Sequence, residues 1–80
     1  MQVIGVRRCE FTAKDGTEVK GYNIFIAYEI ISNGKGLQAD KFFLSDKKVS
    51  DMKLNLDELV GKEIKLSYNK WAKVDGIEIL

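Results

Sequence analysis

The order of its strand-like segments constrains the fold of this chain more than any other feature. In five segments apolar residues recur at every second position, the period of a half-buried strand. A single short segment, LNLDELV, has helical spacing and lies between the third and fourth of them. In chain order we predict strands at Gln2–Phe11, Val19–Ile31, Gln38–Ser45, Lys62–Trp71 and Gly76–Leu80, with the helix at Leu54–Val60.

A β-β-β-α-β-β order in a chain of 80 residues is typical of an OB barrel. We therefore predict one all-β domain over residues 1–80, a five-stranded OB-type barrel with one short helix. Such barrels mostly bind ligands, often single-stranded nucleic acid. Because a fold does not determine a function, the ligand has to be argued from particular residues.

Composition removes several kinds of chemistry. The chain has no histidine and one cysteine, Cys9, so disulfide scaffolds, common zinc sites and histidine-based triads are excluded. Its carboxylates lie along polar segments with no sign of a pocket that would separate their pKa values. We therefore expect no enzyme and no cofactor, and we interpret Cys9 as a small buried apolar residue.

Charge and hydropathy set two further expectations. The formal net charge is +1, so any contact with phosphate depends on local placement of lysine and arginine. No segment has the length of a signal-peptide core or a membrane span, so we expect a cytoplasmic protein.

Glycine and asparagine positions predict the connections. Asp15-Gly16 and Asp75-Gly76 each predict a two-residue hairpin turn, and Asn55 and Gly61 predict the start and end of the helix. We expect the polar, charged segment Ser45–Lys53 to be an exposed connection. An interruption of the alternation predicts a β-bulge at Arg7-Arg8.

The predicted registers divide the side chains into two faces. The inward set is Ile24, Ile26, Ile30, Phe42, Leu44, Ile64, Leu66, Val3 or Ile4, Val6, Ile77 and Ile79, and Tyr22 and Tyr28 share the face of the isoleucines. Phe25, Phe43 and Trp71 fall on the outward faces beside lysines. Exposed aromatic rings can stack on bases, while lysines contact the phosphates.

Two basic loops flank the predicted ligand face of the barrel. The candidate phosphate contacts are Lys14, Lys20, Lys41, Lys70 and Lys73. Arg7-Arg8 could contact phosphate or simply be solvated. The aromatic residues could equally cover the far side of a thin barrel or lie in a dimer interface.

Two long segments, FTAKDGTEVKGYNIFIAYEI and LVGKEIKLSYNKWAKVDGIEI, resemble the small helix-destabilising, single-stranded DNA-binding proteins of filamentous phages. The resemblance implies a five-stranded OB fold and a two-fold dimer. It also implies that Lys14, Tyr22, Tyr28 and Lys70 contact DNA, with Lys20 near a further basic position. The implied positions of Tyr22 and Tyr28 conflict with the inward register, and Val74 replaces an aromatic residue of the family's last hairpin.

The sequence therefore predicts non-specific binding of single-stranded DNA by a homodimer, in phage or mobile-element DNA metabolism. Base stacking is assigned to Phe25, Phe43 and Trp71, then Tyr22 and Tyr28. The dimer contact is assigned to the hairpin Tyr68–Ile77. The alternative is a protein-interaction module on an OB or SH3-like barrel, with the aromatic residues buried against a partner.

Overall fold

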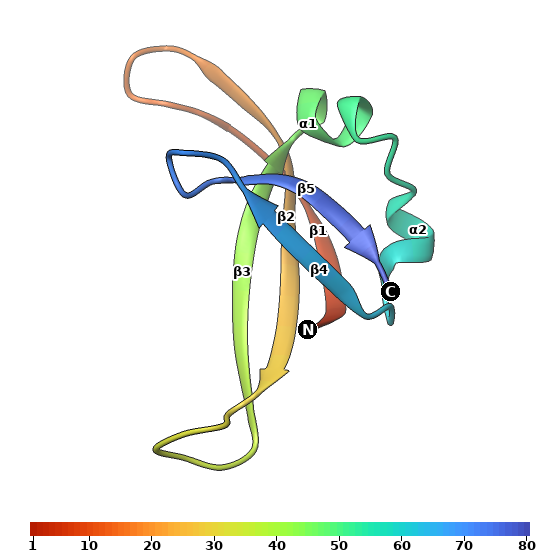
Figure 1. Ribbon diagram of the computed structural model, residues 1–80. Helices are drawn as coiled ribbons and strands as arrows, with labels where there is room; N and C mark the ends of the chain where they lie inside the picture. Colours follow the sequence, from red (N-terminus) through yellow and green to blue (C-terminus); the bar gives the residue numbers. More distant parts are fainter.

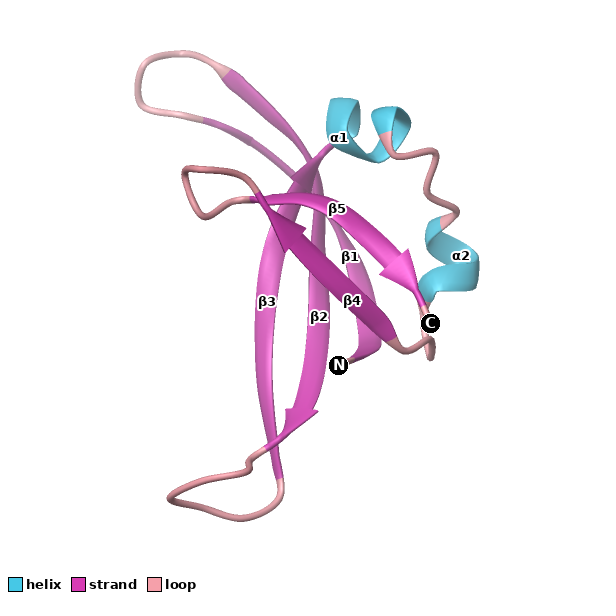
Figure 2. Ribbon diagram, viewed as in Figure 1, coloured by secondary structure: helices cyan, strands magenta, loops and turns pink.

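The computed structural model describes residues 1–80 and consists mostly of antiparallel β-structure. Three long strands form a sheet in the order β1-β2-β3, and the two short strands β4 and β5 form a separate hairpin that crosses one face of it (Figures 1 and 2). Two short helices lie between β3 and β4. The elements are β1 (Gln2–Thr12), β2 (Glu18–Glu29), β3 (Leu37–Ser45), α1 (Asp46–Asp51), α2 (Leu56–Leu59), β4 (Ile64–Tyr68) and β5 (Val74–Ile79).

The two sheets meet along only one edge. The N–H of Val3 donates to the carbonyl of Lys62 at 3.0 Å, and the carbonyl of Val3 accepts from the N–H of Gly61 at 2.7 Å. β3 pairs only with β2, and β5 pairs only with β4. The predicted order of five strands is confirmed, but the structure contains no closed barrel, because β3 and β5 are not joined by a ladder.

The core lies between the long sheet and the hairpin. Its buried residues come from the predicted inward set, with the exception of one leucine of α2; they are Val3, Ile24, Ile26, Leu44, Leu59 and Ile64. Burying each of these side chains contributes about 1.5–3 kcal/mol. The prediction that Ile79 points inward is wrong, since it is 50% exposed at the open edge of β5.

The helical region differs from its prediction in one respect. α2 begins as expected, because the Asn55 side chain accepts from the N–H of Asp57 at 3.1 Å, and it ends before Gly61, whose φ is +89°. The Ser45–Lys53 connection contains no buried residue, but it includes α1, a helix that was not predicted. There the Ser45 hydroxyl accepts from the N–H of Lys48 at 3.2 Å and so caps α1.

The β1–β2 connection is a three-residue loop rather than the predicted two-residue turn. The N–H of Ala13 donates to the carbonyl of Thr17 at 2.7 Å, and only Gly16 has a positive φ, +87°. A type I′ turn needs positive φ at both central residues, which Asp15 does not have. Asp15 instead accepts from the N–H of Thr17 at 3.0 Å, and this bond lowers the pKa of its carboxyl.

The β4–β5 connection has the same form and lies at a different place from the one predicted. The N–H of Asn69 donates to the carbonyl of Lys73 at 2.9 Å, and Ala72 takes the left-handed position with φ +60°. Asp75-Gly76 lies within β5 and marks an irregular pairing, not a turn. A Cβ on Gly76 would lie 2.5 Å from the Ser67 hydroxyl, so glycine permits close approach there.

The predicted bulge in β1 is also misplaced. The register shift lies between Val3 and Gly5, while Arg7 and Arg8 pair regularly with Asn23 and Tyr22. The two arginines therefore point to opposite faces of the sheet. No helix in the structure is long and apolar enough to cross a membrane.

Replacing Ala72 with glycine should raise the free energy of unfolding by about 0.5–1 kcal/mol, because a left-handed conformation costs a non-glycine residue about 1–2 kcal/mol. Urea denaturation measures the change. Ala39→Gly in β3 is the control and should lower stability by a similar amount. Equal destabilisation by both changes would contradict the assigned loop conformation.

Candidate nucleic-acid interface

The face of the long sheet that points away from the hairpin is called here the outer face. Successive rows across β1, β2 and β3 place Gly5 beside Phe25 and Lys41, then Arg7 beside Asn23 and Phe43, then Cys9 beside Gly21 and Ser45. Phe11 pairs with Val19 in the row beyond. None of these positions carries a carboxylate, so this part of the surface differs from the near-neutral chain as a whole.

Aromatic rings on the outer face lie over glycines. Phe43 is 40% exposed and covers Gly21, since its ring would come within 2.6 Å of a Cβ at that position. Phe25 is half-buried over Gly5, at 3.8 Å from the corresponding position, and Phe11 is exposed. The glycines therefore leave room for the two rings to lie along the sheet, where they present flat apolar surface.

Arg7 and Lys41 are the two cations of the outer face, and neither forms an ion pair. The ion pairs of the chain lie elsewhere: the N-terminus with Glu63, Lys20 with Glu18, and Arg8 with Glu10 and Asp46. Arg7 and Lys41 therefore keep their charges available for an anion. Their position matters because the chain has a net charge of only +1 and so no overall basic field.

Arg8 has a structural role that its neighbour does not share. Its guanidinium donates to both carboxylate oxygens of Asp46, to Glu10 Oε1 at 2.8 Å and 3.2 Å, and lies 5.0 Å from the centre of the Tyr22 ring. These contacts join α1 to β1 and lower the pKa of Asp46. Of the predicted Arg7-Arg8 pair, only Arg7 remains a candidate phosphate contact.

Acid should weaken the contact between α1 and β1. Because Asp46 has a folded-state pKa below its ordinary 3.8, it contributes stability above that pH and loses it as pH falls through the folded value. Asp46→Asn should therefore flatten the acid limb of a plot of urea midpoint against pH, leaving the part due to Asp15. Asp51→Asn is the control, and equal curves for wild type and Asp46→Asn would contradict the assignment.

The tip of the β4–β5 hairpin carries the second group of predicted contacts. Trp71 is 69% exposed, and the Lys70 ammonium lies 4.6 Å from the centre of its ring. The Asn69 side chain accepts from the N–H groups of Trp71 and Lys73 at 2.9 Å and 3.1 Å and so shapes the turn. The prediction of a strand reaching Trp71 is therefore wrong, because Asn69 ends the extended segment.

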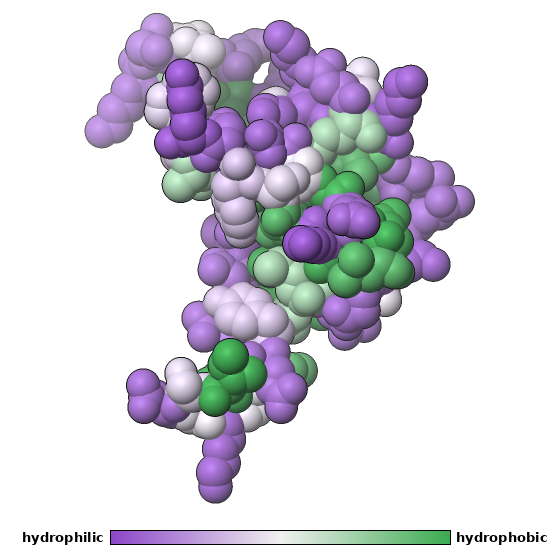
Figure 3. Space-filling view, in the orientation of Figure 1, coloured by the Kyte–Doolittle hydropathy of each residue, from purple (hydrophilic) through white to green (hydrophobic).

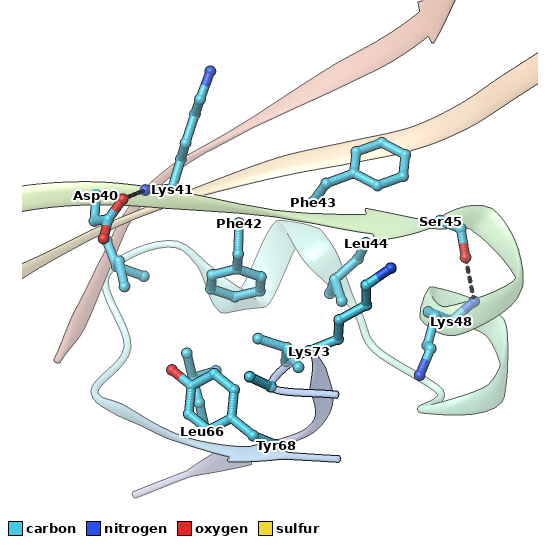
Figure 4. Close-up of a pocket in the computed structure, with 13 residues that line it drawn as sticks. Asp40, Lys41, Phe42, Phe43, Leu44, Ser45, Lys48, Leu66, Tyr68 and Lys73 are labelled. Carbon is cyan, nitrogen blue, oxygen red and sulfur yellow. Dashed lines mark hydrogen bonds between the residues drawn. The ribbon is translucent and has the colours of Figure 1, made fainter. Parts of the chain in front are cut away.

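The structure divides the predicted site residues between surfaces. Phe25, Lys41 and Phe43 share the outer face, whereas Lys73 of the β4–β5 turn lies on the other side of β3 (Figure 4). Lys70 and Trp71 belong to the same turn. Lys14 is exposed in the β1–β2 loop, which projects from the same half of the molecule as the hairpin tip (Figure 1). The Lys20 ammonium forms an ion pair with the Glu18 carboxylate, with Nζ 3.5 Å from Oε2. Tyr22 and Tyr28 pack against the core, as the register predicts.

A cleft of about 510 Å³ opens between β3 and the hairpin. Apolar side chains form its floor, and Asp40, Lys48, Tyr68 and Lys73 stand around it. In Figure 4, Phe42 and Leu44 point towards Leu66 and Tyr68, whereas Lys41 and Phe43 point away. Sequence reasoning missed Lys48 and Tyr68 as parts of a cleft, because the lysine lies on the unpredicted helix and the tyrosine was assigned to the dimer contact.

Metal-binding clusters and comparisons with known proteins give no further indication of the site's function. The structure contains no group of three or more cysteine, aspartate and glutamate residues placed to hold a metal ion. No protein-family model, no curated protein and no solved structure matches the chain.

Proposed function

We propose that this protein binds single-stranded DNA on the outer face of its long sheet, without strong sequence preference, and that it does so in the cytoplasm as a binding protein and not an enzyme. The sequence resemblance to the phage helix-destabilising proteins supports this ligand. A role in phage or mobile-element DNA metabolism is proposed on that resemblance alone.

The observation that carries the proposal is the alternation of rings and unpaired cations on the outer face. Phe25, Phe43 and Phe11 present apolar surface, with Lys41 in the row of Phe25 and Arg7 in the row of Phe43, and neither cation forms an ion pair. Each base stacked on such a ring contributes about 1–3 kcal/mol, and this contribution is similar for all four bases. Aromatic rings next to free cations are thus suited to a flexible, unpaired strand.

The dimensions of the face fit a short stretch of DNA. Along β2 the outward positions from Val19 to Phe25 span about 20 Å at roughly 3.3 Å per residue. Single-strand sites on OB-type folds take about 4–16 nucleotides. We propose that a strand which continues past the edge of β3 meets Trp71 and Lys70 at the hairpin tip.

Phe43→Ala should weaken binding of a fluorescein-labelled oligo-dT by about 1–3 kcal/mol, because it removes the most central stacking surface. Fluorescence anisotropy measures the affinity, and circular dichroism verifies folding at the assay temperature. Phe42→Leu, one residue away and on the cleft side, is the matched control. Equal affinities for wild type and Phe43→Ala, or equal losses in both variants, would refute the assignment of the outer face.

An interaction module is the second candidate, and a separate apolar surface favours it. Ile4, Val60, Ile79 and Leu80 are exposed, and the backbone bonds that join β1 and β5 to residues 61–64 hold their segments together. Figure 3 shows apolar surface gathered beside the C-terminus, and such surface is typical of contact sites. The homodimer through Tyr68–Ile77 stays a prediction.

A further inference from the structure

We propose that the cleft between β3 and the β4–β5 hairpin binds an extended peptide in which acidic and apolar residues alternate, by adding it as a strand to the open edge of β3. This function is separate from the proposed binding of DNA and does not depend on it. Three properties of the cleft support it: an edge of β3 that pairs with no other strand, an apolar floor and surrounding lysines.

The backbone groups come from alternate residues of β3. The N–H of Ile30 donates to the carbonyl of Gly36 at 2.9 Å, and the β2–β3 register has no shift. In an antiparallel ladder, bonded and non-bonded pairs alternate, so Phe42 and Leu44 bond to β2 while Lys41 and Phe43 direct their N–H and C=O groups to the open edge. The N–H of Lys41 indeed donates to the Asp40 carboxylate, at 2.8 Å.

A row of backbone groups that pair with no strand favours a peptide over a nucleic acid at this edge. An added strand pairs its own N–H and C=O groups with them and places alternate side chains on opposite faces. Nucleic acid has no matching row of amides. The edge is short and partly blocked by Asp40, which is a common means of preventing uncontrolled pairing of exposed strands.

The two faces of such a strand meet different surfaces. Its inward side chains reach the apolar floor, where Phe42 and Leu44 of β3 face Leu66 of the hairpin (Figure 4). Its outward side chains lie beside Lys41. A cleft of about 510 Å³ is within the size range of ordinary ligand sites, so it can accept apolar side chains from such a strand.

The charged side chains around the cleft determine which charge the bound peptide should carry. Lys41, Lys48 and Lys73 border the cleft, and none of them forms an ion pair. The only carboxylate among the lining residues is Asp40, which accepts from the Lys41 N–H. An acidic strand is therefore favoured over a neutral or basic one.

The test uses a capped, fluorescein-labelled peptide of seven residues in which glutamate alternates with valine. We expect saturable binding to the full chain by anisotropy, and no binding when lysine replaces glutamate in the peptide. Lys41→Pro and Lys41→Ala both remove the charge, but only proline removes the edge N–H. Lys41→Pro should bind about tenfold more weakly than Lys41→Ala, as expected for loss of one backbone hydrogen bond.

Several outcomes would overturn the proposal. Absence of peptide binding, or equal binding of the acidic and basic peptides, would do so directly. Displacement of the peptide by unlabelled oligo-dT from wild type, but not from Phe25→Ala, would place the peptide on the outer face instead of in the cleft. Sedimentation as a dimer that Lys41→Pro dissociates would show that a second copy occupies the edge. Failure of DNA binding alone would leave the peptide result unaffected.

Discussion

Gly21→Ala should lower the free energy of unfolding by about 3 kcal/mol or more, at or above the upper end of ordinary overpacking. A Cβ at this position would lie 2.8 Å from the Ser45 Cα, 2.6 Å from the Phe43 ring and closer still to the Leu44 carbonyl oxygen. Two of these three neighbours are backbone atoms of β3, which cannot move without breaking the ladder. Since small domains have a free energy of unfolding of only about 5–15 kcal/mol, this single change should remove a large part of it.

Gly5→Ala provides the matched control for that change. The nearest atom to its added Cβ is on the Phe25 ring at 3.8 Å, an ordinary contact distance. Urea denaturation followed by far-UV circular dichroism should show a large loss for Gly21→Ala and little change for Gly5→Ala. Similar midpoints for the two variants would contradict the close packing of β3 and Phe43 on Gly21.

Reversing both charges of the outer face, with Arg7→Glu and Lys41→Glu together, should weaken oligo-dT binding at least about 100-fold at low salt, because two phosphate attractions become repulsions. The double change lowers the formal net charge from +1 to −3. Lys47→Glu with Lys62→Glu makes the same change on α1 and before β4, away from the outer face, and should cost far less. Anisotropy titrations measure both.

Equal losses in the two double variants would mean that total charge, and not the outer face, governs binding. That result would remove the special role of Arg7 and Lys41. Circular dichroism of both variants is required first, although neither Arg7 nor Lys41 forms an ion pair whose loss would weaken the fold.

The period of two located the strands and the core, because packing on one face of a sheet requires it. Ile24, Ile26, Leu44 and Ile64 are buried as predicted. The same period also placed Phe25 and Phe43 on one outer face beside Lys41. These features depend on side chains that are near neighbours within a ladder, so local pattern was sufficient to find them.

Features that depend on longer-range contact were missed. Asp75-Gly76 has the composition of a turn, yet the turn lies before it in the chain, where the Asn69 side chain accepts from the N–H of Trp71. Gly76 instead allows Ser67 of the neighbouring strand to approach closely. α1 lies in a polar segment, and its position depends on the bonds from Arg8 to Asp46. The open edge between β3 and β5, and with it the cleft, cannot be derived from either strand alone.

The resemblance to the phage proteins implied that Tyr22 and Tyr28 contact DNA, whereas the strand register predicted that they point inward. Both tyrosines pack against the core, so the alternation of apolar residues was the better guide to their positions. Trp71 was expected to join the outward aromatic residues of the sheet, but it lies in the turn between β4 and β5. A fixed side-chain period cannot be extended past the end of a strand.

A salt titration of oligo-dT binding by the wild-type protein tests the central claim most directly. If Arg7 and Lys41, with a contact at the hairpin tip, neutralise about two to four phosphates, log K should fall against log salt with a slope of roughly −1.4 to −2.8. Binding should be similar for oligo-dT and mixed sequences and much weaker for duplex DNA. Absence of binding at low salt, or a slope near zero, would contradict the account.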